Sequence, residues 1–154
     1  NIGNPGNLGN VLRITEGGPI GDFYGKRFAG FTVDGKWLFH KADGTIGRSS
    51  DMVDADKAII GNGLPKYYAS LTNTFKYKNI DLTVFLRGKF KYDILNTVDL
   101  FYGNQNLLPG NILSSALGQY SHINEAPQYS DYYLERGDFV KLDNVTIFIL
   151  VPQR

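Results

Sequence analysis

Cysteine is missing from this sequence of 154 residues. Its absence excludes a disulfide framework, a thiolate zinc site and a cysteine nucleophile. An excess of one charge sign is missing too, because 16 Lys and Arg residues against 15 Asp and Glu residues leave a formal net charge of +1. This balance argues against nucleic acid as a partner. The first ten residues, NIGNPGNLGN, have neither the basic nor the apolar region of a signal peptide, so none is expected there.

Long apolar runs are also missing. No stretch of about 18 apolar residues occurs, which excludes a transmembrane helix, whereas a membrane-barrel strand needs only about 9–11 alternating residues. Aromatic residues and glycine are abundant instead, with ten Tyr, ten Phe and 18 Gly beside a single Met. Because this composition favours strands and turns over helices, we predict an all-β fold class, built as an antiparallel meander of hairpins.

The clearest hairpin is predicted over residues 67–93. Its first strand, YYASLTNTFKY, alternates in polarity, and a short turn at Lys78-Asn79 leads into a second alternating strand that continues to Asp93. The apolar face of this second strand consists of Ile80, Leu82, Val84, Leu86, Gly88, Phe90 and Tyr92. The opposite face carries a basic row, which consists of Arg87, Lys89 and Lys91. Alternation alone leaves open whether a protein core or lipid covers the apolar face.

The first third of the chain is predicted to form short elements. A short strand is expected at residues 11–15, and Gly17-Gly18 is expected to form a tight turn. Two Asp-Gly steps, at 34–35 and 43–44, flank KWLFHKA and predict a compact hairpin-type element. Residues 45–66 are predicted to be mostly loop with a short helical turn near Met52.

The last third of the chain loses the alternation. Residues 94–130 are predicted to be a long polar loop with one helical stretch at 112–117, and two strand-like pieces around 136–138 close the chain. Loops of this length are uncommon in compact domains and usually functional where they occur. A short turn on one side and long loops on the other are typical of an outer-membrane barrel.

Four stretches, in order, carry a resemblance to a known family: EGGPIGDFYG (16–25), IIGNGLPKYYASLTNTFKYKNIDLTVFLRGKFKYDILN (59–96), DYYLERGDFVKLDNVTI (131–147) and Pro152. Together they resemble the C-terminal part of the β-barrel of SusC/RagA-type TonB-dependent outer-membrane receptors. The chain departs from the family pattern in TIFILV (146–151), which is apolar on both parities. By the resemblance, Phe148 and Leu150 of this segment would fill lumen-side positions.

The resemblance implies that residues 1–154 are a single segment, the late C-terminal part of such a receptor barrel, without the plug domain. It implies a section of an up-and-down barrel in the cell outer membrane, with lipid on the apolar strand face and a wet lumen on the basic face. Family members import oligosaccharide or peptide nutrients with a lipoprotein lid, driven by TonB. A SusD-like surface lipoprotein, TonB, membrane lipid and a glycan or peptide ligand are therefore expected partners of the full-length parent.

Candidate substrate-binding residues follow from this interpretation. Arg87, Lys89 and Lys91 would form a lumen wall that attracts anionic or polar solutes, and an ordinary solvated sheet face is the alternative. Tyr102 and Tyr120 lie in the predicted long loop, where tyrosine rings can stack on sugars or peptides while their hydroxyls form hydrogen bonds. Packing within the loop is the alternative for each tyrosine.

Other chemistry finds little support. Asp51, Asp54 and Asp56 are clustered as in a calcium loop, but they lack the alternate-residue spacing and the closing Glu, so a solvated loop is expected. His40 and His122 are far apart in sequence, and Ser114, Ser115 and Ser121 lie outside any Gly-x-Ser-x-Gly elbow. We therefore expect no enzyme activity, no metal and no cofactor.

Two hypotheses remain open. The first is that the chain is part of an outer-membrane TonB-dependent transporter for oligosaccharides or peptides. The second is a soluble β-rich binding or structural domain from a truncated receptor gene, without transport activity. A soluble chain would have to cover its apolar face by curling, by its loops or by pairing with a copy of itself, so a homo-oligomer is one form it could take.

Overall fold

The computed structural model describes residues 11–151 of the chain, which divides into two compact units. Of the described residues, 11–63 and 93–135 form the core unit, and 64–92 and 136–151 form the sheet unit. The opening segment 1–10 and Pro152, which entered the sequence analysis, lie outside the described residues.

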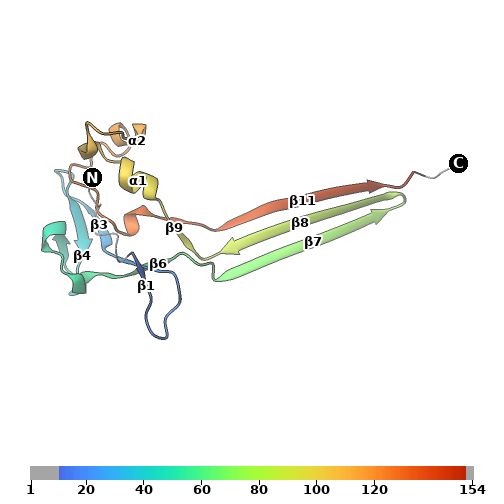
Figure 1. Ribbon diagram of the computed structural model, residues 1–154, viewed down its shortest axis with the longest axis horizontal. Helices are drawn as coiled ribbons and strands as arrows, with labels where there is room; N and C mark the ends of the chain where they lie inside the picture. The colour runs from blue at the N-terminus through green and yellow to red at the C-terminus, as the bar shows by residue number, and fades with distance from the viewer. Residues whose placement is uncertain (1–10, 152–154) are drawn as a thin grey trace. The chain divides into compact units, whose positions relative to one another are not determined.

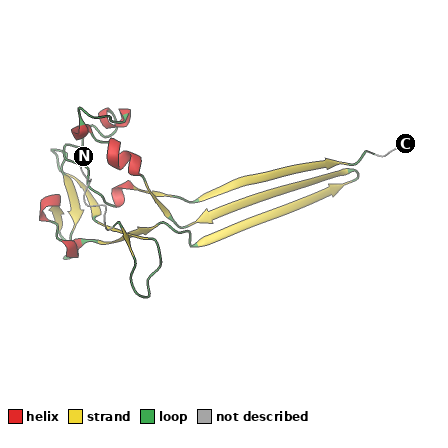
Figure 2. Cartoon of the chain, in the orientation of Figure 1, coloured by secondary structure: helices red, strands yellow, loops and turns green. Residues whose placement is uncertain are grey.

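Antiparallel strands dominate both units, and helices are few and short (Figure 2). The predicted all-β fold class is confirmed. None of the helices within residues 11–151 is long and apolar enough to cross a membrane.

The sheet unit is built from three strands of 11 residues each: β7 (Tyr67–Tyr77), β8 (Ile80–Phe90) and β11 (Phe139–Ile149). Their order is β11-β8-β7, and Figure 1 shows the three strands side by side. The predicted hairpin is confirmed, because Tyr77 pairs with Ile80 across the turn at Lys78-Asn79, where Lys78 has φ +52°. Within residues 11–151, β7 and β11 are the two edges of this sheet.

The second strand of the hairpin is shorter than predicted. β8 ends at Phe90 rather than Asp93, because Lys91 adopts a left-handed conformation with φ +57°. The backbone N–H of Lys91 donates to Asp138 Oδ1 at 2.7 Å instead of continuing the ladder. Tyr92 packs over Gly137, whose N–H donates to the Tyr92 carbonyl at 2.9 Å, and any side chain at Gly137 would clash with this ring. The expected alternation of Tyr92 and Lys91 with the strand is therefore wrong.

The core unit contains three small sheets. One has the order β1-β2-β6, one β3-β4-β5 and one β10-β9. The strand bounds are β1 (Leu12–Arg13), β2 (Asp22–Gly25), β3 (Arg27–Phe31), β4 (Trp37–His40), β5 (Ile46–Arg48), β6 (Ala58–Asn62), β9 (Asp93–Leu95) and β10 (Leu134–Arg136). Helical segments are α1 (Thr97–Tyr102), α2 (Ser114–Leu117) and the single-turn segments η2 (Ser49–Asp51), η3 (Asp54–Asp56), η4 (Gln105–Leu107) and η5 (Asp131–Tyr133).

The hairpin-type element between the two Asp-Gly steps is confirmed as β3-β4-β5. Gly35 donates to the Thr32 carbonyl at 2.9 Å and Gly44 to the Lys41 carbonyl at 3.2 Å. Both glycines have positive φ, +77° and +84°, which such tight turns require and which glycine adopts without steric cost.

Two predicted loops proved to be structured. Residues 45–66 were expected to be mostly loop, but they contain β5 and β6, and β6 pairs with β2. Residues 94–130 contain α1 in addition to the predicted helical stretch, which is α2. Asn104, fully buried in this segment, donates from Nδ2 to the Glu125 carbonyl at 2.8 Å. Side-chain to backbone bonds of this kind carry no sequence periodicity, which explains why the pattern analysis missed them.

Aromatic side chains form the core of this unit. Its buried residues are Trp37, Phe39, Leu100, Ile123, Tyr129 and Tyr133. Trp37 stacks on Phe39 with centroids 6.2 Å apart, and its indole Nε1–H donates to the Ala126 carbonyl at 2.9 Å. The predicted loop thus supplies both core side chains and the hydrogen-bond partner of the central tryptophan.

Candidate functional site

The sheet unit presents two chemically different faces, and it is the candidate functional region of the chain. The pairing register places Leu71 of β7 beside Leu86 of β8 and Leu142 of β11, so these three side chains share one face. Twelve apolar side chains on this face form what we call the apolar face: Leu71, Phe75, Tyr77, Ile80, Leu82, Val84, Leu86, Val140, Leu142, Val145, Ile147 and Ile149. Asn73 is a polar exception within it.

The apolar face is open. Leu71, Phe75, Val140 and Ile147 are each between 54% and 67% exposed. A contiguous exposed apolar surface of this kind marks contact with a membrane or with another protein. Strands of 11 residues have the length that tilted strands need to cross the hydrocarbon layer.

A β-bulge in β11 keeps the apolar face continuous. Leu142 pairs with Leu86 and Asn144 with Phe85, so Asp143 is an extra residue without a partner in the ladder. Before the bulge the even-numbered residues lie on the apolar face, and after it the odd-numbered residues Val145, Ile147 and Ile149 do. Without this extra residue, the second half of β11 would turn Asn144 and Thr146 toward the apolar face.

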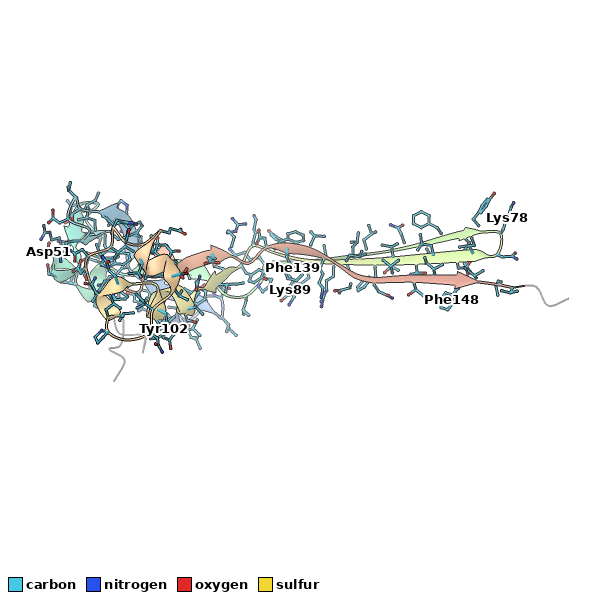
Figure 3. All side chains as sticks on the ribbon, turned by 90° about the horizontal axis from the view of Figure 1, so that it is seen from above. Asp51, Lys78, Lys89, Tyr102, Phe139 and Phe148 are labelled. Carbon is cyan, nitrogen blue, oxygen red and sulfur yellow. The ribbon has the colours of Figure 1, made fainter. Side chains whose placement is uncertain are left out.

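The bulge also determines which face each side chain takes in the β11 part of TIFILV (146–151), the segment that is apolar on both parities. Phe148 pairs with Asp81 and therefore lies on the polar face, because the extra residue at Asp143 reverses the parity of β11. Figure 3 shows Phe148 and Lys78 at one end of the sheet and Phe139 with Lys89 at the other. Phe148 is 64% exposed.

The polar face carries a group of charges near the β11 bulge. Arg87 Nε lies 2.7 Å from Asp143 Oδ2, and Arg87 Nη2 donates to Asp143 Oδ1 at 3.3 Å. Lys141 Nζ is 3.5 Å from the same Oδ1. Lys89 lies on this face as well, with its ammonium 5.6 Å from the centroid of the Tyr68 ring.

The structure separates the predicted basic row. Arg87 and Lys89 share the polar face of β8, whereas Lys91 lies beyond the strand end, with its ammonium 5.4 Å from the Tyr67 ring centroid. Lys141 and Asp143, which sequence analysis did not select, join Arg87 instead. The pair of opposite charges in the middle of the late strand, VKLDN, was the available signal.

Tyr102 and Tyr120 belong to the core unit. Tyr102 ends α1 and is 40% exposed. Tyr120 packs against the buried core, and its hydroxyl donates to Asp99 Oδ2 at 3.2 Å. Burial, with the adjacent Asp99 carboxylate, raises the pKa of the Tyr120 phenol. Packing within the loop therefore accounts for Tyr120, while Tyr102 keeps an exposed ring.

The three clustered aspartates hold backbone and surface partners. Asp56 accepts hydrogen bonds from the Ala42 and Val53 N–H groups, both at 2.9 Å, and these bonds lower the pKa of its carboxyl. Asp54 pairs with Lys57 at 2.7 Å, and Asp51 accepts from the Arg48 N–H at 3.2 Å. In the part of the chain that the structure describes, no three His, Asp or Glu side chains are grouped so as to hold a metal ion.

The remaining candidates are separate from one another. His122 packs edge-on against Phe31 with centroids 5.0 Å apart, and its Nδ1 lies 3.1 Å from the Gln119 carbonyl. Lys26 Nζ, held near the Phe39 ring, donates to Ser49 Oγ and Gln128 Oε1 at 2.9 Å each. Burial lowers the pKa of Lys26. This triangle ties Lys26, between β2 and β3, to η2 and to the segment before η5.

Comparison with known proteins gives one informative similarity. No family model matches the chain. The chain is 24% identical over 164 residues to TonB-dependent receptor P3 of Formosa agariphila, an alignment that covers 91% of this chain and 16% of the receptor. The chain thus spans about one sixth of the length of that relative. The similarity supports the TonB-dependent receptors as the related family, at a coarser level than the SusC/RagA type.

Proposed function

We propose that this chain is part of the barrel wall and loops of an outer-membrane TonB-dependent transporter that imports oligosaccharide or peptide nutrients. In this interpretation the SusC/RagA type is the specific subgroup, and TonB and a SusD-like surface lipoprotein are the partners of the full-length parent. The residues of this chain carry out no covalent chemistry. Their role is to separate lipid from a polar passage.

The observation that carries the proposal is the two-faced sheet unit. Twelve apolar side chains from three paired strands share one face, while Arg87, Lys89 and Lys141 share the other. In a membrane barrel the outward face meets hydrocarbon and the inward face meets water, with a period of two residues along each strand. The bulge at Asp143 supports this interpretation, because it preserves the separation of the faces across an otherwise disruptive sequence.

The strand ends support the same interpretation. Tyr67 and Tyr68 lie at one end of the sheet, and Phe75 and Tyr77 lie toward the other. Lys78 lies 5.3 Å from the Tyr77 ring and Lys91 lies 5.4 Å from the Tyr67 ring. Aromatic rings beside basic groups suit the two membrane interfaces, where one side of the ring is apolar and the other is wet.

The alternative, a soluble β-rich binding or structural domain, draws on the core unit. This unit buries a tryptophan, a phenylalanine and two tyrosines without help from lipid. A soluble chain would still have to cover the apolar face of the sheet unit, and pairing with a second copy would do so.

Face-selective labelling distinguishes the two functions. Because the chain has no cysteine, Val84→Cys and Thr83→Cys each create a unique labelling site on neighbouring residues of β8 with opposite faces. We would attach an environment-sensitive fluorophore to each and compare emission in buffer, in neutral detergent and with neutral lipid vesicles. Light scattering on the same samples gives the mass of the particle.

The transporter proposal expects a blue shift at position 84 on addition of lipid, little change at position 83, and aggregation without detergent. A detergent-independent monomer or small oligomer, in which vesicles leave both labels unchanged, would contradict it. Equal shifts at both positions would contradict the two-faced arrangement itself.

A further inference from the structure

Two neighbouring rows on the polar face of the sheet unit combine aromatic rings with cations. In the first row, Lys89 pairs with Tyr68 on one side and with Phe139 on the other. In the second row, Arg87 pairs with Ser70 and with Lys141. We call the basic patch the set formed by Tyr68, Arg87, Lys89, Phe139, Lys141 and Asp143.

The charges of the basic patch are unbalanced. Three cations face one carboxylate, and Asp143 is directed mainly to Arg87, which it contacts through two nitrogen atoms. Lys141 is the more distant partner at 3.5 Å and its side chain is 62% exposed. Among residues 11–151, Lys89 makes no ion pair. Its ammonium group lies over the aromatic ring of Tyr68. A net positive charge therefore remains on this face.

The aromatic rings give the basic patch a second property. Tyr68 is 67% exposed, and Phe139 lies on the far side of Lys89 in the same row. Neighbouring strands are about 4.8 Å apart, so a group bound at Lys89 lies within reach of both rings. A pyranose ring can stack its C–H face on an aromatic ring while an anionic substituent contacts the ammonium. An acidic peptide offers the charge without this stacking surface.

We propose that the basic patch binds carboxylate or sulfate groups of an anionic oligosaccharide. The proposal rests on the proposed transport function and names the substrate class of its lumen face. Asp143 acts as a counter-charge that limits the strength of binding, because it occupies the guanidinium of Arg87 that would otherwise hold the anion.

Three ligands with one backbone test the proposal: cellohexaose, its C6-carboxylate and its C6-sulfate derivative, titrated by calorimetry into the full chain in neutral detergent. We expect both anionic forms to bind and to weaken as salt rises, with neutral cellohexaose at least about tenfold weaker. If only one anionic form binds, the patch discriminates the carboxylate from the sulfate. Hexaglutamate serves as the probe for the peptide class.

Two substitutions in the basic patch should change the binding affinity in opposite directions. Lys89→Gln should weaken binding about two- to fivefold, as loss of one exposed charge contact does. Asp143→Asn should tighten binding, because it removes the counter-charge without removing a cation. The matched control is Lys76→Gln, which removes the same charge from the same face. Lys76 lies at the opposite end of the sheet from Lys89 and pairs with Asp81 at 3.2 Å. It should leave affinity unchanged.

Several results would overturn the proposal: cellohexaose binding as tightly as its anionic forms, Lys76→Gln weakening binding as much as Lys89→Gln, or hexaglutamate binding as tightly as the carboxylate. The fluorophores at positions 83 and 84 are read in the same samples. If the label at 84 meets detergent and no anionic sugar binds, the substrate class is wrong and the barrel-wall function stands. If the labels show no difference between faces, the transport function fails whatever binds.

Discussion

The core unit and the sheet unit use the same kinds of residue in opposite ways. Trp37 and Phe39 in the core unit are completely buried, whereas Phe75 and Phe148 in the sheet unit are 58% and 64% exposed. The core unit packs its aromatic rings against one another, and the indole N–H of Trp37 donates to a backbone carbonyl. The sheet unit gives its apolar side chains no such neighbours. The difference indicates that composition does not decide whether an apolar surface is buried or exposed.

The hydrogen bonds of the two units differ in the same sense. In the core unit, side chains form hydrogen bonds with backbone groups far away in the sequence. Glu125 Oε2, for example, accepts a hydrogen bond from the backbone N–H of Trp37 at 2.9 Å. In the sheet unit, the long strand ladders supply the order, and the charged contacts gather at the bulge and at the strand ends. The hydrocarbon of a membrane offers no water to backbone N–H and C=O groups. Strands whose backbone groups bond to neighbouring strands suit that environment.

The largest expected effect comes from truncating one phenylalanine in each unit. Phe39→Ala should lower the free energy of unfolding of the core unit by about 3–5 kcal/mol, because it leaves a cavity beside Trp37. Phe75→Ala, on the exposed apolar face, should change it by less than about 0.5 kcal/mol, with both variants measured in neutral detergent. Trp37 is the only tryptophan of the chain, so its fluorescence during urea unfolding reports on the core unit in both variants. Equal losses would mean that the two units share one core.

A smaller effect is expected for charge on the apolar face. Val84→Arg places a guanidinium near the middle of β8 and should weaken transfer of the chain from buffer to neutral vesicles by about 2–4 kcal/mol. Thr83→Arg, one residue away on the polar face, should cost less than about 1 kcal/mol. Flotation of vesicles with bound chain measures both. A penalty that is the same at the two positions would remove the distinction between the faces.

The bulge offers a sharper version of the same comparison. Ile147 and Phe148 are both apolar neighbours in β11, but the register assigns them to opposite faces. Ile147→Lys should weaken vesicle binding by about 1 kcal/mol, since Ile147 lies nearer the strand end than Val84 lies, and Phe148→Lys should have almost no effect. The reverse order would show that β11 pairs without the extra residue at Asp143.

The hairpin and the loops show how far sequence reasoning reached. Alternation over residues 67–90 predicted the pairing of β7 with β8 and its turn, because a two-residue period is local and strong. It could not predict the break at Lys91, which depends on the hydrogen bond from its N–H to Asp138, 47 residues away. Nor could it predict the bulge, since TIFILV fits either parity and the cross-strand pair of Arg87 with Asp143 is a long-range contact.

The same limit applies to the candidate site. Sequence analysis selected Arg87 and Lys89 because they share one strand, whereas Lys141 and Asp143 reach them only through the pairing of β8 with β11. Tyr120 shows a second limit of sequence reasoning. Its place in a polar stretch suggested an outer loop, and only the packing of α1 and its neighbours shows that the ring contributes to the core.

The smallest effect concerns the pH dependence of the core unit. Two backbone N–H groups donate to Asp56 and lower the pKa of its carboxyl below the ordinary 3.8, so its ionised form is favoured in the folded state. The stability this provides is therefore present above the ordinary pKa and is lost as the pH falls through the depressed value. Asp56→Asn should remove this part of the acid dependence of the unfolding transition that Trp37 fluorescence reports.

Asp54→Asn is the matched control, because the side chain of Asp54 is 82% exposed and holds Lys57 through a surface ion pair. Salt at about 1 M should abolish the effect of Asp54→Asn and leave that of Asp56→Asn, since screening weakens exposed ion pairs far more than hydrogen bonds to backbone N–H groups. If salt removes both effects, Asp56 acts through its charge alone, and the order of the loop after β5 must have another source.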